Sequence, residues 1–157
     1  MWDIFLIYGW IGIDIKWIMK KELRKIPGLG FGSAKVGHIF LDRSNARAAL
    51  ESINQARKIL VNGTSVVVFP EGTRSKTGKM GAFKRGAFKM ATDFNLPILP
   101  VTVNGTHKIM RSGTFNLMPG SASLTIHKPI LPKQFKDMDM DELANWVRET
   151  IGKKVEA

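Results

Sequence analysis

The chain has 157 residues, of which 44% are hydrophobic, and it carries a formal net charge of +11 at pH 7. This length suits one domain with its own core, and the composition excludes an intrinsically disordered chain. The absence of cysteine excludes disulfides, thiol catalysis and cysteine-ligated metal sites. The excess of positive charge favours an anionic partner, such as nucleic acid, acidic lipid headgroups or a phosphorylated small molecule.

The N-terminal region opens with an uncharged stretch, residues 4–13, that is rich in aromatic side chains. It is too short to span a bilayer, and it lacks the basic region and cleavage site of a signal peptide. Trp2, Trp10 and Trp17 lie in or near this stretch and suit a lipid interface as well as a protein core, and both interpretations stay open. A short apolar run follows at 15–19, and the alternating glycines of residues 26–32 predict a loop rather than a dinucleotide-binding turn.

The middle of the chain alternates between strand and helix patterns. Residues 38–41 predict a buried strand, and Ser44 predicts the N-cap of a helix that Gly63 ends. The apolar, β-branched run at 65–69 predicts the next strand.

The C-terminal half continues the alternation. Apolar residues at helical spacing predict a helix over 83–94, and residues 96–103 and 122–127 predict two further strands. Asp139 with Glu142 three positions on forms a capping box that predicts the start of the last helix. Strands separated by helices predict an α/β fold with a largely parallel central sheet and helices on both faces, formed by residues 1–157 as one domain.

The turn at residues 69–75 reads Phe-Pro-Glu-Gly-Thr-Arg-Ser and directly follows a predicted strand. Open α/β sheets bind ligands at the carboxyl ends of their strands. Gly72 allows the main chain to approach a ligand closely, and Arg74 offers a planar guanidinium that suits phosphate or carboxylate. Residues 71–111 hold eight lysines and arginines against two acidic residues, so positive charge is concentrated around this turn. A solvated turn is the alternative interpretation.

Three segments lie at the ends of predicted strands: Gly-His-Ile-Phe-Leu-Asp-Arg at 37–43, Phe-Pro-Glu-Gly-Thr-Arg at 69–74, and Leu-Pro-Ile-Leu-Pro-Val at 96–101. In this order they resemble the glycerolipid acyltransferases, and most nearly the 1-acylglycerol-3-phosphate (lysophosphatidic acid) acyltransferases. That family carries Gly-x-x-Phe-x-Asp-Arg, then Phe-Pro-Glu-Gly-Thr-Arg, then a Val-Pro-Ile-x-Pro-Val-like strand. The resemblance covers roughly residues 3–130 and implies a glycerolipid acyltransferase-like fold.

The resemblance implies a site for the phosphate of the acyl acceptor. In the family the two motif arginines are associated with that phosphate, and they match Arg43 and Arg74 here. The turn that shapes the same pocket matches Glu71, Gly72 and Thr73. A phosphomonoester carries close to two negative charges at pH 7, so fixed cations suit it. Candidates for the acyl donor or the pocket wall are Lys16, Lys20, Pro100 and Val101.

Several lysines add to a field that steers anionic substrates towards the site, although each taken singly also fits a solvated surface. These are Lys16, Lys20, Lys21 and Lys84.

The resemblance also implies a catalytic pair, of which the chain contains one member. The family's first motif is Asn-His-x-x-x-x-Asp, in which the histidine takes the proton from the acceptor hydroxyl and the aspartate orients that histidine. Asp3 matches the aspartate, and the matching histidine would be the third residue before Met1. No aspartate stands five positions after His38, His107 or His127, so none of these replaces it by pattern.

Two interpretations account for the missing histidine. In the favoured one, Met1 is an internal methionine of a longer chain, because it falls on a variable position of the motif while the phosphate motifs are intact. In the other, the chain is a binding-only remnant. In both, we expect the 157-residue polypeptide to be inactive or slowed by at least about 10²–10⁴-fold, the usual contribution of a general base.

The sequence therefore predicts an acyltransferase of phospholipid biosynthesis. It would transfer a fatty acyl group from acyl-CoA or acyl-carrier protein to 1-acylglycerol 3-phosphate, forming phosphatidate, with no cofactor and no metal. The expected partners are the lysophospholipid, the acyl thioester, a membrane surface and, as a further candidate, acyl-carrier protein. The expected location is the cytoplasmic face of a membrane, without a transmembrane segment in this chain.

Two alternatives belong to other classes. One is a non-catalytic peripheral membrane or lipid-binding remnant. The other is a basic nucleic-acid-binding module, which is disfavoured because the aromatic residues follow apolar stripes and no RNP, KH or zinc pattern is present.

Overall fold

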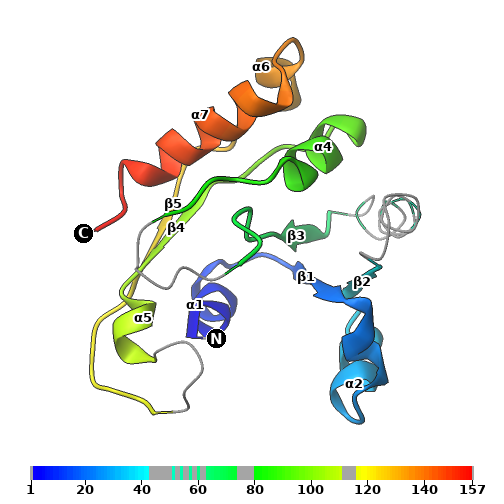
Figure 1. Cartoon of the computed structure of the whole chain (residues 1–157), viewed down its shortest axis with the longest axis vertical. Coiled ribbons are helices and arrows are strands. Elements are labelled where there is room, and N and C mark those ends of the chain that lie inside the picture. Colours follow the sequence, from blue (N-terminus) through cyan, green and yellow to red (C-terminus); the bar gives the residue numbers. More distant parts are fainter. Residues whose placement is uncertain are drawn as a thin grey trace. The chain divides into compact units, whose positions relative to one another are not determined.

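The computed structural model describes residues 2–42, 51, 54, 57, 60, 63–73, 80–110 and 116–156. It confirms an α/β fold, in which helices alternate with a parallel sheet and a smaller antiparallel pair (Figure 1). Among these residues, no helix combines the length and the apolar character needed to cross a bilayer. The chain divides into two compact units, one formed by Ile13–Val68 and the other by Met1–Gly12 with Phe69–Ala157.

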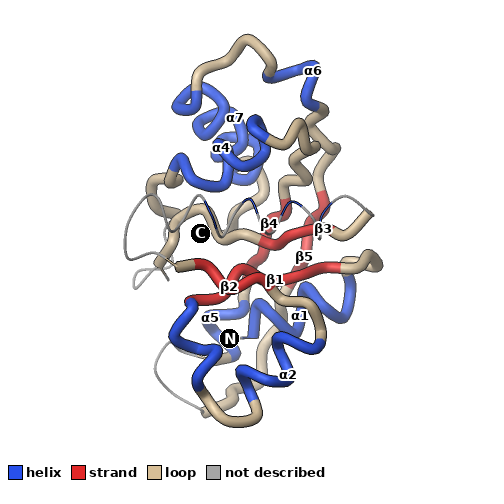
Figure 2. The backbone as a smooth tube through the Cα atoms, turned by 90° about the vertical axis from the view of Figure 1, so that its right-hand side faces the viewer, coloured by secondary structure: helices blue, strands red, loops and turns tan. Residues whose placement is uncertain are grey.

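The unit Ile13–Val68 contains the parallel sheet, in which β1 lies between β2 and β3 (Figure 2). Two short helical segments connect β1 to β2. Its elements are β1 (Ile15–Lys20), the 3₁₀ helix η1 (Lys21–Lys25), α2 (Leu29–Lys35), β2 (Ile39–Leu41) and β3 (Ser65–Val67).

The register of this sheet is staggered along β1. Its N-terminal half pairs with β3, with Ile15 opposite Ser65, and its C-terminal half pairs with β2, with Lys20 opposite Leu41. Lys20 is therefore level with the end of β2. The residues that follow each of these two strands start from the same edge of the sheet, where ligand sites of parallel sheets are found.

The predicted loop at 26–32 is wrong in part, because α2 begins at Leu29. Gly28, with a φ of 76°, stands at the N-cap position of this helix. At Gly30 an added Cβ would lie 2.0 Å from the carbonyl oxygen of Arg24, so only glycine lets the helix approach η1 this closely. Gly30 therefore serves close packing, and Gly28 serves a positive φ at the start of the helix, whereas the sequence pattern indicated a loop throughout.

The helix predicted from Ser44 to Gly63 falls largely outside the described residues, and this includes its N-cap. Within it, Glu51, Asn54, Arg57 and Leu60 are helical. Leu60 is buried, as its place in the predicted apolar stripe requires.

The second unit holds the remaining elements. The strands predicted near 96–103 and 122–127 are present, but they pair antiparallel, with Val101 opposite Ile126 and Asn104 opposite Ser123. The parallel character of the sheet therefore belongs to β1, β2 and β3. The elements of this unit are α1 (Trp2–Trp10), α4 (Arg85–Asp93), β4 (Val101–Asn104), α5 (Thr106–Ile109), β5 (Ser123–Ile126), α6 (Pro132–Phe135) and α7 (Met140–Gly152).

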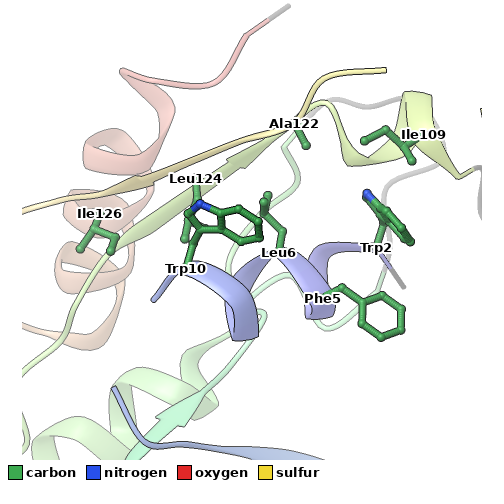
Figure 3. A pocket seen from close by; sticks show the side chains of 8 residues that line it. All are labelled: Trp2, Phe5, Leu6, Trp10, Ile109, Ala122, Leu124 and Ile126. Atoms are coloured by element: carbon green, nitrogen blue, oxygen red, sulfur yellow. The ribbon is translucent and has the colours of Figure 1, made fainter. Parts of the chain in front are cut away.

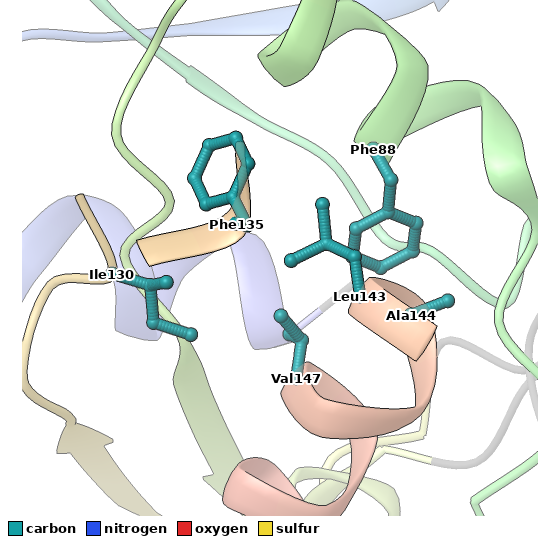
Figure 4. Packing of buried hydrophobic residues seen from close by; sticks show 6 residues of the cluster. All are labelled: Phe88, Ile130, Phe135, Leu143, Ala144 and Val147. Atoms are coloured by element: carbon teal, nitrogen blue, oxygen red, sulfur yellow. The ribbon is translucent and has the colours of Figure 1, made fainter. Parts of the chain in front are cut away.

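The core of this unit forms where α4, α6 and α7 meet (Figure 4). Leu143 is almost completely buried there, and Phe83 and Phe88 stack with ring centroids 6.3 Å apart. Burying such side chains contributes about 1.5–3 kcal/mol each relative to leaving them exposed. The cluster consists of Phe88, Ile130, Phe135, Leu143, Ala144 and Val147.

The last helix, α7, begins as predicted. The Asp139 carboxylate accepts hydrogen bonds from the backbone N–H groups of Asp141 and Glu142, and the Glu142 carboxylate accepts one from Asp139 N at 3.1 Å. This reciprocal box satisfies donors that the first turn of a helix leaves free.

The end of α7 and the residues that follow it are tied to β4, which α7 contacts (Figure 1). The buried Thr102 hydroxyl donates to the Ile151 carbonyl at 3.0 Å. Asn104 Nδ2 donates to the Lys154 carbonyl at 2.8 Å, and its Oδ1 accepts from Glu156 N at 3.2 Å. Two buried polar side chains thus fix the C-terminal helix against the strand.

Candidate functional site

The turn that carries the Phe-Pro-Glu-Gly-Thr segment is closed by main-chain hydrogen bonds. Gly72 N donates to Phe69 O at 3.0 Å, and Lys84 N donates to Pro70 O at 2.8 Å. Gly72 has a φ of 71°, which other residues adopt only with strain. Gly72 and Thr73 are exposed, so their main chain is accessible to a ligand.

Glu71 is half-buried, and its carboxylate already has a partner. Gly81 N donates to Glu71 Oε2 at 2.7 Å. Arg148 on α7 holds the same segment from another side, because its Nε donates to Gly81 O at 3.1 Å and its Nη2 to Met80 O at 3.4 Å. The turn, residues 80–81 and α7 are therefore linked by three hydrogen bonds.

Lys84 supplies a cation beside this turn. A Cβ added at Gly72 would lie 2.9 Å from Lys84 Nζ, so the ammonium group lies directly over the glycine. Lys84 is exposed, and the main chain at Lys84 is itself fixed to Pro70. The sequence assigned Lys84 only to a general steering field, whereas the structure brings it to the turn.

The two motif arginines, Arg43 and Arg74, lie outside the described residues. Their expected role at the acceptor phosphate stays a prediction. Thr73, the last described residue before Arg74, is exposed. In the other unit, Asp42 directly precedes Arg43 and binds the Lys21 ammonium at 2.8 Å.

Two adjacent lysines, Lys20 and Lys21, lie at the carboxyl end of β1. Lys20 ends β1 and is exposed, and the hydrogen-bonded carboxylate of Asp42 raises the pKa of Lys21. Lys16, on the same strand, is less accessible, since its side chain is 16% exposed and bound to Asp14 at 2.9 Å. That contact lowers the pKa of Asp14.

His38 lies beside Lys16 in this unit. Its Nδ1 accepts a long hydrogen bond from Trp17 N, at 3.5 Å. Burial, followed by the positive charge of Lys16, lowers the pKa of His38 from 6.5, while Asp14 opposes this effect. His38 is therefore neutral near pH 7, with one ring nitrogen serving as acceptor for the main chain.

His127 has a structural role. The Thr102 hydroxyl hydrogen points to Ile151 O, so Thr102 Oγ1 accepts from His127 Nε2, 2.8 Å away. Nε2 then carries the proton of the neutral ring, which leaves Nδ1 as the ring's acceptor. His107 is exposed on α5.

Asp3, the residue that matches the family aspartate, lies in the first turn of α1 and is half-buried. Pro100 is buried and its carbonyl accepts from His127 N at 3.0 Å, while Val101 starts β4 and is half-buried. Neither the catalytic role of Asp3 nor the pocket role of Pro100 and Val101 is tested by these contacts.

An apolar cavity of about 470 Å³ opens between α1, α5 and β5 (Figure 3). Trp10 and Phe5 remain largely exposed at it, whereas Ile109 is buried. The lining residues are Trp2, Phe5, Leu6, Trp10, Ile109, Ala122, Leu124 and Ile126.

Within the described parts of the chain, no three His, Asp or Glu side chains gather as metal ligands do.

Sequence reasoning did not single out Gly81 or Arg148. Arg148 and Gly81 are 67 positions apart, and such a contact leaves no local pattern. Met80 and Gly81 also belong to no helix or strand.

The chain belongs to the Acyltransferase family, whose sequence model matches residues 1–104. This region includes Asp3 and the whole of both proline-containing motifs, at 69–74 and 96–101. Family membership confirms the class of protein that the three sequence motifs predicted.

The relatives narrow the family further. A chloroplastic 1-acyl-sn-glycerol-3-phosphate acyltransferase of Brassica napus is 35% identical over 150 residues, which cover 95% of this chain and 43% of the relative. The 1-acyl-sn-glycerol-3-phosphate acyltransferase of Pseudomonas aeruginosa is 30% identical over 156 residues, covering 96% of this chain and 60% of the relative. The chain thus spans about half the length of the relatives that it matches.

A solved structure supports the same grouping. The crystal structure of the 1-acyl-sn-glycerophosphate acyltransferase PlsC from Thermotoga maritima matches with a TM-score of 0.80 and 36% sequence identity. The match covers 96% of this chain and 59% of that one. The fold is therefore that of an acyltransferase of this group.

Proposed function

We propose that this chain carries the acyl-transfer domain of a 1-acylglycerol-3-phosphate acyltransferase, which forms phosphatidate from 1-acylglycerol 3-phosphate and a fatty acyl thioester. The observation that carries this proposal is the agreement in name among the relatives from plants and bacteria and the solved neighbour. The family match over residues 1–104 includes segments of both compact units, which supports assigning both to one acyltransferase domain.

The reaction follows from the chemistry of the two substrates. The free hydroxyl oxygen of the acceptor attacks the thioester carbonyl carbon, the new C–O bond forms, and the C–S bond breaks to release the thiol. The hydroxyl proton passes to a general base, because an alcohol is a poor nucleophile at neutral pH. In the family motif this base is a histidine, and its position falls outside residues 1–157. We assign to Asp3 the role of orienting that histidine.

The acceptor phosphate is assigned to the motif arginines and the turn. Arg43 and Arg74 would provide two planar guanidinium groups. Gly72 and Thr73 would offer main chain that is accessible to the phosphate. The Lys84 ammonium over Gly72 supports this assignment, since it adds a cation at the accessible part of the turn. Glu71 contributes by shaping the turn, since its Oε2 accepts a hydrogen bond from Gly81 N.

The acyl donor is acyl-CoA or acyl-carrier protein, and Lys16, Lys20, Pro100 and Val101 are the residues proposed for the donor or the pocket wall. The exposed lysine at the end of β1 suits an anionic donor. The apolar cavity beside α1 supports a substrate with fatty chains, because its lining is aliphatic and aromatic.

We assign the domain to the cytoplasmic face of a membrane, where its lipid substrates reside. The exposed aromatic side chains of α1 support contact with a lipid surface: Phe5 is 58% exposed and Trp10 is 73% exposed. The same observation favours the second candidate function, a non-catalytic peripheral membrane protein.

Acceptor binding by the chain separates these functions. A short-chain 1-acylglycerol 3-phosphate should bind in calorimetry, while the matching 1-acylglycerol without phosphate should not. Arg74→Ala should weaken binding of the phosphate-bearing lipid by about tenfold or more, as expected for loss of a charge-assisted hydrogen bond. The matched control Arg85→Ala removes the same charge from an exposed pair with Asp141 and should bind within about twofold.

Three results would contradict the proposal. Equal binding of the two lipids would exclude phosphate recognition. Liposome binding that survives both Arg43→Ala and Arg74→Ala, without acceptor selectivity, would favour the peripheral membrane protein. Salt-sensitive binding to RNA or DNA, with none to the lysophospholipid, would revive the nucleic-acid alternative.

A further inference from the structure

Arg148 lies on α7, outside the residues that match the Acyltransferase family. Its side chain is half-buried, and its two hydrogen bonds go to the main-chain carbonyls of Met80 and Gly81 rather than to a carboxylate. A guanidinium is a planar and rigid set of donors. When it binds two successive carbonyl oxygens, it fixes the orientation of the peptide group between them.

That peptide group also reaches Glu71. The Met80 carbonyl and the Gly81 N–H belong to one planar trans peptide unit, so they point in opposite directions. Arg148 Nη2 binds the oxygen on one side, and the N–H donates to Glu71 Oε2 at 2.7 Å on the other. A cation on the carbonyl oxygen polarises the peptide and strengthens its N–H as a donor. Arg148 is therefore coupled to Glu71 without touching it.

The packing around this link leaves little freedom. A Cβ added at Gly81 would lie 3.0 Å from Glu71 Oε2, so glycine is the residue that fits without displacing the carboxylate. On the other side, a Cβ added at Gly152 of α7 would lie 3.3 Å from Met80 Cε. Residues 80–81 are thus held between the turn and α7 by both hydrogen bonds and close packing.

We propose that Arg148 is a positioning residue for the acceptor phosphate, which acts by holding the Met80–Gly81 peptide group and, through it, Glu71 and the main chain of Gly72 and Thr73. The ligand class is a phosphomonoester, and Arg148 makes no contact with it. This inference rests on the proposed function of the turn. It extends the site to a helix that the family match does not include.

The link itself is tested by the Gly81 amide resonance in a ¹H–¹⁵N spectrum of the chain. Arg148→Ala should shift this resonance, because the peptide loses its cation and its short bond to Glu71 relaxes. Glu71→Ala should shift the same resonance. Arg85→Ala is the matched control, because it also removes an arginine side chain that contacts α7, through Asp141. It should leave the Gly81 resonance unchanged.

The function of the link is tested by calorimetric binding of short-chain 1-acylglycerol 3-phosphate. Arg148→Ala should weaken binding by about tenfold, and Arg148→Lys should restore only part of it, because an ammonium cannot bind both carbonyls as the fork does. In the Glu71→Ala background, Arg148→Ala should have less than about a twofold further effect, since both substitutions break one chain of contacts. Should Arg148→Ala fail to fold, Gly81→Ala tests the same link from the other side and should weaken binding similarly.

An unshifted Gly81 resonance in Arg148→Ala would overturn the proposal. So would unchanged acceptor affinity in a folded Arg148→Ala, or independent, multiplicative effects of Arg148→Ala and Glu71→Ala. If the unaltered chain binds no 1-acylglycerol 3-phosphate, the proposed function fails, and the assignment of Arg148 to acceptor binding fails with it. Normal binding by the unaltered chain and by Arg148→Ala would reject the inference alone.

Discussion

Glu71 belongs to the Phe-Pro-Glu-Gly-Thr-Arg motif, and its contact in the structure limits the role that it can have. A carboxylate beside a phosphate is unfavourable, because like charges repel and an ionised carboxylate cannot donate a hydrogen bond. Here its oxygen accepts from Gly81 N, which turns the charge towards the protein's own main chain. The sequence could place Glu71 in a candidate site, but only the structure shows that its contact is internal.

Lys84 should contribute directly to acceptor affinity. We expect Lys84→Ala to weaken binding of 1-acylglycerol 3-phosphate about three- to tenfold. The loss is that of a charge-assisted contact, and it is limited because solvent screens the exposed ammonium group. Lys89→Ala is the control, because Lys89 lies nearby on α4 and its ammonium pairs with Asp93 at 3.0 Å. Equal losses in the two variants would mean that only overall charge matters.

His38 should make stability depend on pH. Its pKa is lowered in the folded chain, so between that pKa and 6.5 the unfolded chain binds the proton more strongly. The free energy of unfolding, relative to His38→Gln, should therefore be constant above about pH 7.5 and should decrease as pH falls through 6.5. Urea titrations across this range measure it, and a difference that stays constant or grows on acidification would refute the effect.

Elements were predictable where the signal is local. The capping box at Asp139 and Glu142 predicted the start of α7, and the apolar, β-branched runs at 65–69 and 96–103 located β3 and β4. The helix α2 was missed because Gly30 is needed for a contact with the main chain at Arg24, which the sequence does not reveal. The antiparallel pairing of β4 with β5 was missed for a related reason, since strand direction depends on partners distant in the chain.

The link between β4 and α7 should stabilise the fold. Thr102→Val keeps the side-chain shape but leaves the Ile151 carbonyl and His127 Nε2 without their partner. We expect a loss of about 1–3 kcal/mol in the free energy of unfolding, measured by urea titration. Thr125→Val, at the paired position on β5, should cost less than about 0.5 kcal/mol. A Thr102→Val variant as stable as the unaltered chain would show that this contact contributes nothing.

On the scale of the whole molecule, the candidate residues are divided between two compact units. Lys16 and Lys20 belong to one, whereas Asp3, the turn at 69–73 and Pro100 with Val101 belong to the other. Motif order along the chain predicted this set through resemblance to a family. Neither composition nor periodicity could have grouped these residues into one site, because they lie on different elements. The links through Gly81 and Arg148 were beyond any motif, since they connect the turn to a helix near the C-terminus.

The most direct test of the account is the product formed by the native protein. Isotope-labelled acyl-CoA or acyl-carrier protein thioester would be supplied together with 1-acylglycerol 3-phosphate or with 1-acylglycerol, and lipid products would be identified by mass spectrometry. The account predicts labelled phosphatidate from the phosphate-bearing acceptor, little product from the other, and a strong loss of kcat/KM in Arg74→Ala. Absence of phosphatidate with both thioesters, or equal acylation of the two acceptors, would contradict it.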